Sequence, residues 1–176
     1  MAPSALPLSQ VADHCQPDGL TPENAARIAG ELSRTFGVHD DEVAIFKVEQ
    51  AQLKFIFPLS LTKVGMIPLS NSTSVAARTA NSKRPEAINS FAQMRHASFF
   101  ESVPVDSKTR NSQKPGKVAM VIQKMMSVPV IGPAGVLGVI QISRKGASPK
   151  ASGPDFQPTD LQRLASAAAV LAKCFK

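Results

Sequence analysis

Few residues in this sequence of 176 have the types and spacing that catalysis or metal binding requires. The patterns GxSxG, GxxxxGK[ST] and HExxH are absent, and the acidic residues are scattered without a pair suited to acid–base work. His96 is the only histidine of the central region, and no second ligand accompanies it at a suitable spacing. We interpret His96 as a solvent-facing or core histidine, and we predict a protein that is not an enzyme and holds no metal.

The two cysteines, Cys15 and Cys174, lie near opposite ends of the sequence. They form neither a CxxC motif nor a disulfide framework, which is typical of proteins of a reducing cytoplasm. Cys174 continues the apolar spacing of the last helical segment, so we interpret it as a small apolar core residue. We find no run of 18 apolar residues and no secretory signal, and we therefore expect a cytoplasmic protein.

Positive charge is concentrated in the second part of the chain. Residues 1–50 contain eight acidic and three basic residues, whereas residues 51–176 contain five acidic and seventeen basic ones. We interpret the polar segments 102–117 and 144–154 as surface loops, whose basic stretches 106–117 and 144–150 could bind an anion or nucleic acid. The same charges could instead match the acidic part of the fold or of a second copy. The absence of Trp and Tyr disfavours a nucleic-acid partner, because such proteins usually stack bases on aromatic rings. The candidate anion-binding residues are Lys108, Arg110, Lys114, Lys117, Arg144, Lys145 and Lys150.

Apolar spacing predicts a single α+β domain over residues 20–176, preceded by a loose extension over residues 1–19. Thr21 and Pro22 are typical of the first residues of a helix, and Gly37 is typical of its end. Gly138, inside an apolar run, indicates the close approach of another backbone or helix. The remaining predicted elements are a hairpin (42–49 and 53–57), short helices (72–82 and 91–101), a second hairpin (118–131 and 136–143) and a helix from Pro158 to the C-terminus.

Two helical segments carry continuous apolar seams. The first includes Ile28 and Leu32, and the second steps by three and four residues from Leu161 to Phe175. Such seams can pack on the sheet of the same chain or against a second chain, and the sequence leaves both possibilities open. As the seam of a homodimer we take Ile28, Leu32, Leu161, Leu164, Ala168, Leu171 and Phe175.

The C-terminal third, between residues 128 and 171, resembles the end of a GAF domain. The resemblance rests on Val128-Pro129-Val130-Ile131, the turn 132–135, the run 136–142 and the segment Phe156-Gln157-Pro158-Thr159-Asp160-Leu161. It implies a fold related to profilin and PAS domains, with five or six antiparallel strands and the N- and C-terminal helices packed on one face. It also implies a sensory or regulatory module that encloses a ligand pocket, commonly dimerises through its terminal helices and signals to a separate partner chain.

In similar proteins the segment that corresponds to residues 89–101 covers this pocket. Phe91 and Arg95 are four residues apart, so they lie on one face of the helix predicted there. A pocket with an apolar body and one arginine would favour a small carboxylate or phosphate, although Arg95 could instead pair with Glu101 or Asp106 on the surface. The candidate pocket residues are Asn89, Phe91, Arg95, His96, Phe99, Phe100 and Glu101.

The family motifs do not identify the ligand. Members that bind cyclic nucleotides carry an asparagine–lysine pair and then phenylalanine-x-x-x-aspartate-glutamate. Phe156 and Asp160 match this pattern, but Ser143-Arg144 replaces the pair and Leu161 replaces the glutamate; Arg144 could still pair with Asp160. Neither cysteine is placed as bilin-binding or methionine-sulfoxide-reducing members require, so no cofactor is assigned. We expect a stand-alone, non-enzymatic sensor that binds a small molecule, with an anion- or nucleic-acid-binding adaptor as the alternative.

Overall fold

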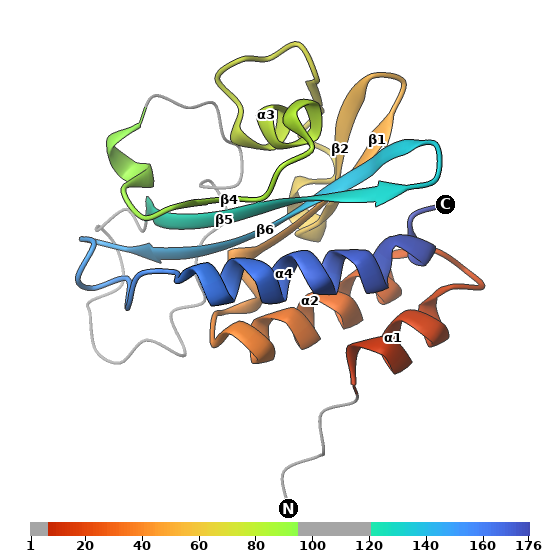
Figure 1. Ribbon diagram of the computed structural model, residues 1–176, viewed down its shortest axis with the longest axis horizontal. Coiled ribbons are helices and arrows are strands. Elements are labelled where there is room, and N and C mark those ends of the chain that lie inside the picture. The colour runs from red at the N-terminus through yellow and green to blue at the C-terminus, as the bar shows by residue number, and fades with distance from the viewer. Residues whose placement is uncertain (1–6, 95–120) are drawn as a thin grey trace, which may run out of the picture.

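The computed structural model describes residues 7–94 and 121–176 (Figure 1). A six-stranded antiparallel sheet in the order β3-β2-β1-β6-β5-β4 forms its centre. The strands are β1 (Val43–Glu49), β2 (Gln52–Phe57), β3 (Met66–Pro68), β4 (Glu86–Ile88), β5 (Val121–Gly132) and β6 (Gly135–Gly146). The helices are α1 (Leu8–Cys15), α2 (Pro22–Phe36), α3 (Val75–Ser82) and α4 (Pro158–Leu171), with 3-10 turns η1 (Asp40–Glu42), η2 (Leu59–Leu61), η3 (Phe91–Gln93) and η5 (Ala172–Cys174).

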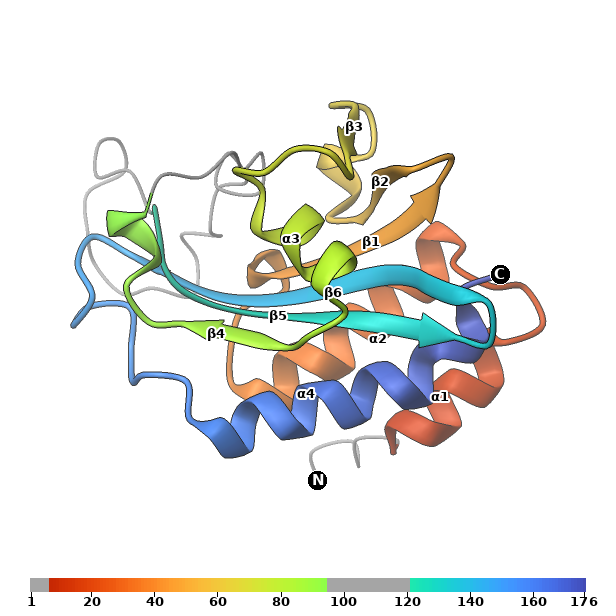
Figure 2. The same ribbon diagram turned by 45° about the horizontal axis from the view of Figure 1, so that its top comes forward.

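The helices divide between the two faces of the sheet. α1, α2 and α4 cover one face, here called the helix face, while α3 lies on the other, here called the pocket face (Figures 1 and 2). The first hairpin turns through Gln50 and Ala51 alone, both at positive φ, so it is a tight two-residue turn and Gln52 already belongs to β2. The second hairpin turns between Gly132 and Gly135, as predicted.

The apolar seams of α2 and α4 pack on the chain's own sheet. Ile28, Leu32, Leu164, Ala168, Leu171 and Phe175 are all buried in the core of the helix face, and Leu161 packs against it. The apolar surface of these residues is covered within one chain, which is the first of the two possibilities that the sequence left open. A Cβ on Gly138 would lie 2.1 Å from the carbonyl oxygen of Phe46 and 2.6 Å from the ring of Phe175, which confirms the close approach predicted there.

A loose extension over residues 1–19 is the wrong description of residues 8–15, which form α1. Leu8, Val11, Ala12 and Cys15 follow the i, i+3, i+4, i+7 spacing of an amphipathic helix, and the last three are buried in the helix-face core. The prolines and polar residues that surround this short segment hide its periodicity in the sequence. The segment after α1 is held by Asn24, whose Nδ2 donates to the carbonyl of Gly19 at 2.8 Å.

The strand β6 continues to Gly146, so the prediction that Arg144 and Lys145 belong to a basic loop is wrong. Arg144 pairs with Lys124 and Lys145 with Ile122 in the β5–β6 ladder. Charge at the end of an apolar run resembles the start of a loop, but these side chains find partners on the two faces of the sheet. Among the described residues, no helix is long and apolar enough to cross a bilayer.

The short helices of the middle region are confirmed only in part. The segment 72–82 contains α3, whose N-cap Ser74 accepts a hydrogen bond from the N–H of Ala77 at 3.2 Å. The helix predicted over 91–101 begins only as the single 3-10 turn η3, since Met94 already has extended backbone angles. Residues 95–101 lie outside the described residues.

Candidate functional site

A small cavity lies between the pocket face of the sheet, α3 and η3. Its volume is about 10 Å³, which is room for roughly one water molecule. Residues from five strands, from the start of α3 and from η3 form its walls: Phe46, Phe55, Ile67, Met125 and Gln141 from the strands, Ser74, Val75 and Ala76 at α3, and Phe91 from η3.

Aromatic rings form much of the apolar wall. Phe46 and Phe55 are paired across β1 and β2, and their ring centroids are 4.4 Å apart with the ring planes tilted by 45°. Phe91 covers the cavity from η3 and is itself 1% exposed. Rings arranged in this way can bury the apolar body of a small molecule.

A chain of buried polar side chains crosses the pocket face beside the cavity. Gln141 Nε2 donates to Ser127 Oγ at 3.2 Å, and Ser127 Oγ lies 2.7 Å from Thr79 Oγ1. Thr79 Oγ1 in turn donates to the carbonyl of Val75 at 2.8 Å, so Ser127 is the donor to Thr79. This chain ties α3 to the sheet, and Gln141 and Ser74 are the polar groups that the described cavity wall offers to a ligand.

Charged groups are buried farther along the pocket face, where β6 meets η1. Glu42 is buried, and its carboxylate accepts hydrogen bonds from the backbone N–H of Lys145 at 2.6 Å and of His39 at 3.0 Å. Lys145 is 0% exposed, and its Nζ donates to the carbonyl of Asp41 at 3.4 Å. A lysine that is buried and bonded in this way supports the fold and is not a surface site for an anion.

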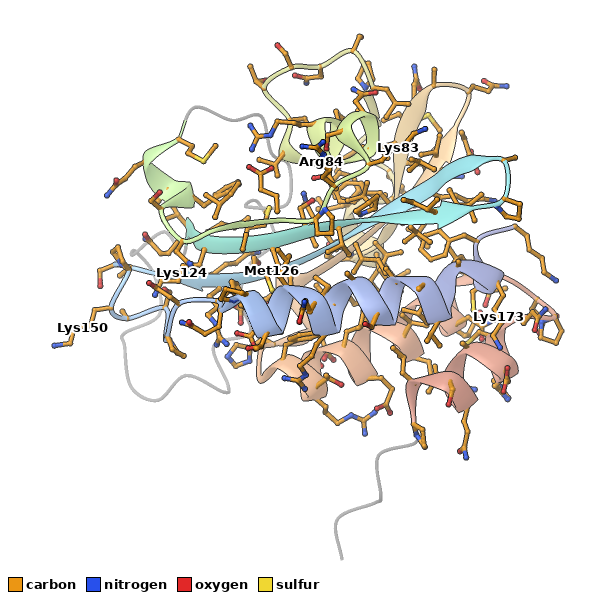
Figure 3. All side chains as sticks on the ribbon, viewed as in Figure 1. Lys83, Arg84, Lys124, Met126, Lys150 and Lys173 are labelled. Carbon is orange, nitrogen blue, oxygen red and sulfur yellow. The ribbon has the colours of Figure 1, made fainter. Side chains whose placement is uncertain are left out.

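On the helix face, Lys124 and Arg144 hold the loop that leads into α4. Lys124 Nζ lies 2.9 Å from a carboxylate oxygen of Asp155 and donates to the carbonyl of Gly153 at 2.5 Å. The guanidinium carbon of Arg144 lies 4.8 Å from the centre of the Phe156 ring. Figure 3 shows Lys150 extending away from this end of the molecule, so it remains an exposed basic residue.

The pairing of Arg144 with Asp160, which the comparison with nucleotide-binding members suggested, is wrong. Asp160 accepts a hydrogen bond from the N–H of Gln157 at 2.8 Å and caps α4, with Arg163 at 3.9 Å. Arg144 instead stacks on Phe156 and donates to the carbonyl of Phe36 at 3.4 Å. The arginine is therefore engaged in fastening α2 and the α4 loop to the sheet.

The candidate pocket residues have different positions. Phe91 lines the cavity, whereas Asn89 turns away from it and bonds to the backbone of Phe156. The other candidates lie outside the described residues: Arg95, His96, Phe99, Phe100 and Glu101, together with the loop residues Lys108, Arg110, Lys114 and Lys117. Sequence reasoning missed Ser127 and Gln141, whose signal is a polar residue inside an otherwise apolar strand.

The two cysteines lie in the helix-face core, away from the cavity. Burial raises the pKa of the Cys15 thiol, and it raises the pKa of Cys174 to about 11, with the nearby Cys15 adding to the rise. Cys174 Sγ donates to the carbonyl of Ala12 at 3.4 Å. Cys174 is thus a buried core residue, as predicted. Among the described residues, no three His, Cys, Asp or Glu side chains are grouped as a metal site would require.

A scan against protein-family models finds no match, and neither does a comparison with curated proteins. Solved structures do match. The GAF domain of the phosphoenolpyruvate-protein phosphotransferase from Acinetobacter is 12% identical with a TM-score of 0.64, covering 96% of this chain and 89% of that one. Residues 122 to 287 of a methyl-accepting chemotaxis protein are 14% identical with a TM-score of 0.64, covering 94% of both chains.

An enzyme has a similar structure. The free methionine-R-sulfoxide reductase from Neisseria meningitidis, solved in complex with its substrate, is 18% identical with a TM-score of 0.60, covering 96% of this chain and 85% of that one. Identities this low show the fold alone. The six-stranded antiparallel sheet, the terminal helices on one face and these matches together confirm the expected α+β architecture: this chain has the fold of GAF domains.

Proposed function

We propose that this protein is a sensory or regulatory domain that binds a small molecule in the cavity of the pocket face and signals through its terminal helices. The observation that carries the proposal is a cavity lined by Phe46, Phe55 and Phe91 on the face opposite to α1, α2 and α4. The similarity to a GAF domain of a phosphotransferase and to a chemotaxis protein supports a regulatory role over other uses of the fold.

The ligand of such a site is a small molecule with a flat or branched apolar body and one or two hydrogen-bonding groups. The apolar body would lie against the phenylalanine rings, and the polar groups would reach Gln141 and Ser74. Ligand pockets usually measure roughly 300–1,000 Å³. Since the present cavity is about 10 Å³, binding must displace part of the wall.

Native mass spectrometry of the purified protein, searching for a retained small molecule, tests this proposal directly. The chain contains no Trp and no Tyr, so a single tryptophan introduced by Met94→Trp, next to the cavity, is a unique fluorescent probe. The matched control is Val170→Trp on the exposed side of α4. A ligand of the cavity changes the emission of the first variant and not of the second; a retained molecule that changes neither contradicts the proposal.

That the protein is not an enzyme is part of the same proposal. The competing activity is the reduction of methionine sulfoxide, since an enzyme with a similar structure is a free methionine-R-sulfoxide reductase. Both cysteines are buried in the helix-face core with raised pKa values, so their thiols are protonated and weakly nucleophilic near neutral pH. Turnover of free methionine-R-sulfoxide with a thiol reductant, abolished in a Cys15→Ala/Cys174→Ala variant, would overturn this assignment.

Dimerisation and a cytoplasmic location remain proposals. Because the apolar seams are covered within one chain, a homodimer formed through the terminal helices would use the outer surface of the helix layer. This surface has the exposed Val170 and a groove of about 610 Å³ between α1, α2 and α4. Light scattering with refractive-index detection measures the mass of a chain that lacks Trp and Tyr. A monomer at high concentration would contradict dimerisation.

The adaptor alternative is weakened by the positions of Arg144 and Lys145, whose charges are engaged within the fold. It retains the exposed Lys150 and the basic stretch 106–117, which lies outside the described residues. Binding to DNA or RNA that falls steeply with salt would favour the adaptor, and no binding at low salt would exclude it.

A further inference from the structure

The side chain of Asn89 bridges β4 and the segment that leads into α4. Its Oδ1 accepts a hydrogen bond from the N–H of Phe156 at 2.9 Å, and its Nδ2 donates to the carbonyl of Phe156 at 3.1 Å. The carboxamide thus bonds to one backbone residue as a neighbouring strand would. β4 is an edge strand, so the bridge passes around the edge of the sheet from the pocket face to the helix face (Figure 2).

Each end of this bridge is two residues away from a functional element. Asn89 precedes Phe91, which covers the cavity, and Phe156 precedes Pro158, the first residue of α4. The ring of Phe156 is 3% exposed in the helix-face core, beneath the guanidinium of Arg144. A displacement of the chain at Phe156 is therefore passed directly to the first turn of α4.

Phe91 is the part of the described cavity wall that lies on the same segment as Asn89. The strands of the wall are paired in the sheet, and α3 is tied to it by the bond between Thr79 and Ser127. Phe91 lies in a single 3-10 turn, closed by the bonds from Gln93 to Ser90 at 3.1 Å and from Met94 to Phe91 at 3.0 Å. A ligand larger than a water molecule must move part of the wall, and a shift of η3 is the movement that Asn89, two residues before Phe91, would transmit.

We propose that Asn89 couples the cavity to α4, so that outward movement of Phe91 pulls on Phe156 and loosens the first turn of the helix. This inference rests on the proposed function, because it names the route by which an occupied cavity reaches a terminal helix. The coupling is reciprocal, so a partner that holds the first turn of α4 in place also opposes displacement of Phe91.

A test without any ligand is a double-mutant cycle on the full chain, measured by amide hydrogen exchange with NMR. The reporters are the amides of Asp160 and Leu161, which donate to the carbonyl of Gln157 at 3.0 and 3.2 Å in the first turn of α4. We expect Phe91→Ala to raise their exchange rates roughly two- to tenfold, in the lower part of the range for residues coupled in one network. In an Asn89→Ala background, Phe91→Ala adds no further increase.

The matched control is Ile67→Ala, which enlarges the same cavity from β3 at the opposite edge of the sheet. It destabilises the core without a route to Phe156, so the ratio of exchange at Asp160 and Leu161 to exchange at the end of α4 stays unchanged. If Phe91→Ala does not fold, Phe91→Leu takes its place in the same cycle.

An equal effect of the Phe91 variant in both backgrounds, or no effect in either, overturns the coupling. The same increase with Ile67→Ala overturns it as well. These outcomes are independent of ligand binding, so the absence of a retained molecule would contradict the proposed function and leave the result of the cycle to decide the coupling.

Discussion

Replacing Gly138 with alanine places a methyl group where two parts of the chain already meet. The new Cβ would lie 2.1 Å from the carbonyl oxygen of Phe46 and 2.6 Å from the ring of Phe175. The ring can rotate, but the carbonyl belongs to β1, which is paired on one side with β2 and on the other with β6. The clash with the backbone can therefore be relieved only by separating β1 from β6.

Overpacking costs about 1–3 kcal/mol where side chains can adjust, so a clash with fixed backbone should lower the free energy of unfolding by at least about 3 kcal/mol. For a chain of this size the melting temperature should fall by roughly 6 °C or more. The assay is denaturant unfolding followed by far-ultraviolet circular dichroism, since the chain lacks tryptophan fluorescence.

Gly132→Ala is the matched control in the same hairpin. The three atoms nearest to its Cβ would all belong to the side chain of Leu137, the closest at 2.7 Å, and that partly buried side chain can change rotamer. We expect a loss below about 1 kcal/mol. A Gly138→Ala variant as stable as this control would refute the reasoning, and so would rescue by Phe175→Ala, because the backbone clash would then not be the cause.

Three further predictions concern the thiols, α1 and the polar chain. The native protein should resist thiol reagents at pH 8 and react at both cysteines once unfolded. Burial raises the folded-state pKa of Cys174 from 9.0 to about 11, so the thiol loses its proton at lower pH in the unfolded state than in the folded state. The free energy of unfolding should therefore fall as the pH rises from about 9 to 11. Stability measured below pH 8 should not depend on this titration, and an increase above pH 9 would contradict it. Val11→Ala should lower the free energy of unfolding by about 1–3 kcal/mol, because the side chain of Val11 is buried between α1 and the core. Asp13→Ala removes only the exposed ion pair with Lys173 and should cost less than about 1 kcal/mol. Equal losses for the two variants in denaturant unfolding would refute the role of α1. Thr79→Val and Ser127→Ala should each cost about 1–3 kcal/mol by leaving the other hydroxyl without its partner, and the double variant should cost less than the sum; additive losses would show that the two hydroxyls do not act together.

The parts of the fold that could be predicted are those where the local pattern and the final packing agree. The seam of α4 has helical spacing and faces the sheet, and the Gly132–Gly135 turn joins two apolar runs that pair along their length. The helix α1 escaped prediction because it is short and its stability comes from packing against α2 and α4 rather than from its own sequence. The C-terminal end of β6 was not predicted, because Arg144 and Lys145 resemble loop residues until their partners on separate elements are known.

The candidate site, too, could be predicted only in part. Phe91 was expected near a pocket from the family resemblance, and it lines the cavity. Asn89 was expected there too, yet its partner Phe156 is 67 positions away, a distance over which no local pattern reports a contact. Ser127 and Gln141 are opposite each other only because of the β5–β6 register, which the sequence of one strand does not specify.

The contact between α1 and the last turn of the chain has a consequence for synthesis. Lys173 pairs with Asp13, and Cys174 bonds to Ala12, so α1 meets these neighbours only once residues 173 and 174 have been synthesised. Until then the apolar sides of α1 and α2 lack part of their cover, and β1 gains its partner β6 only after residues 135–146 have been synthesised. We therefore expect the nascent chain to gain its native protection against proteolysis only after residues 173 and 174 have emerged from the ribosome.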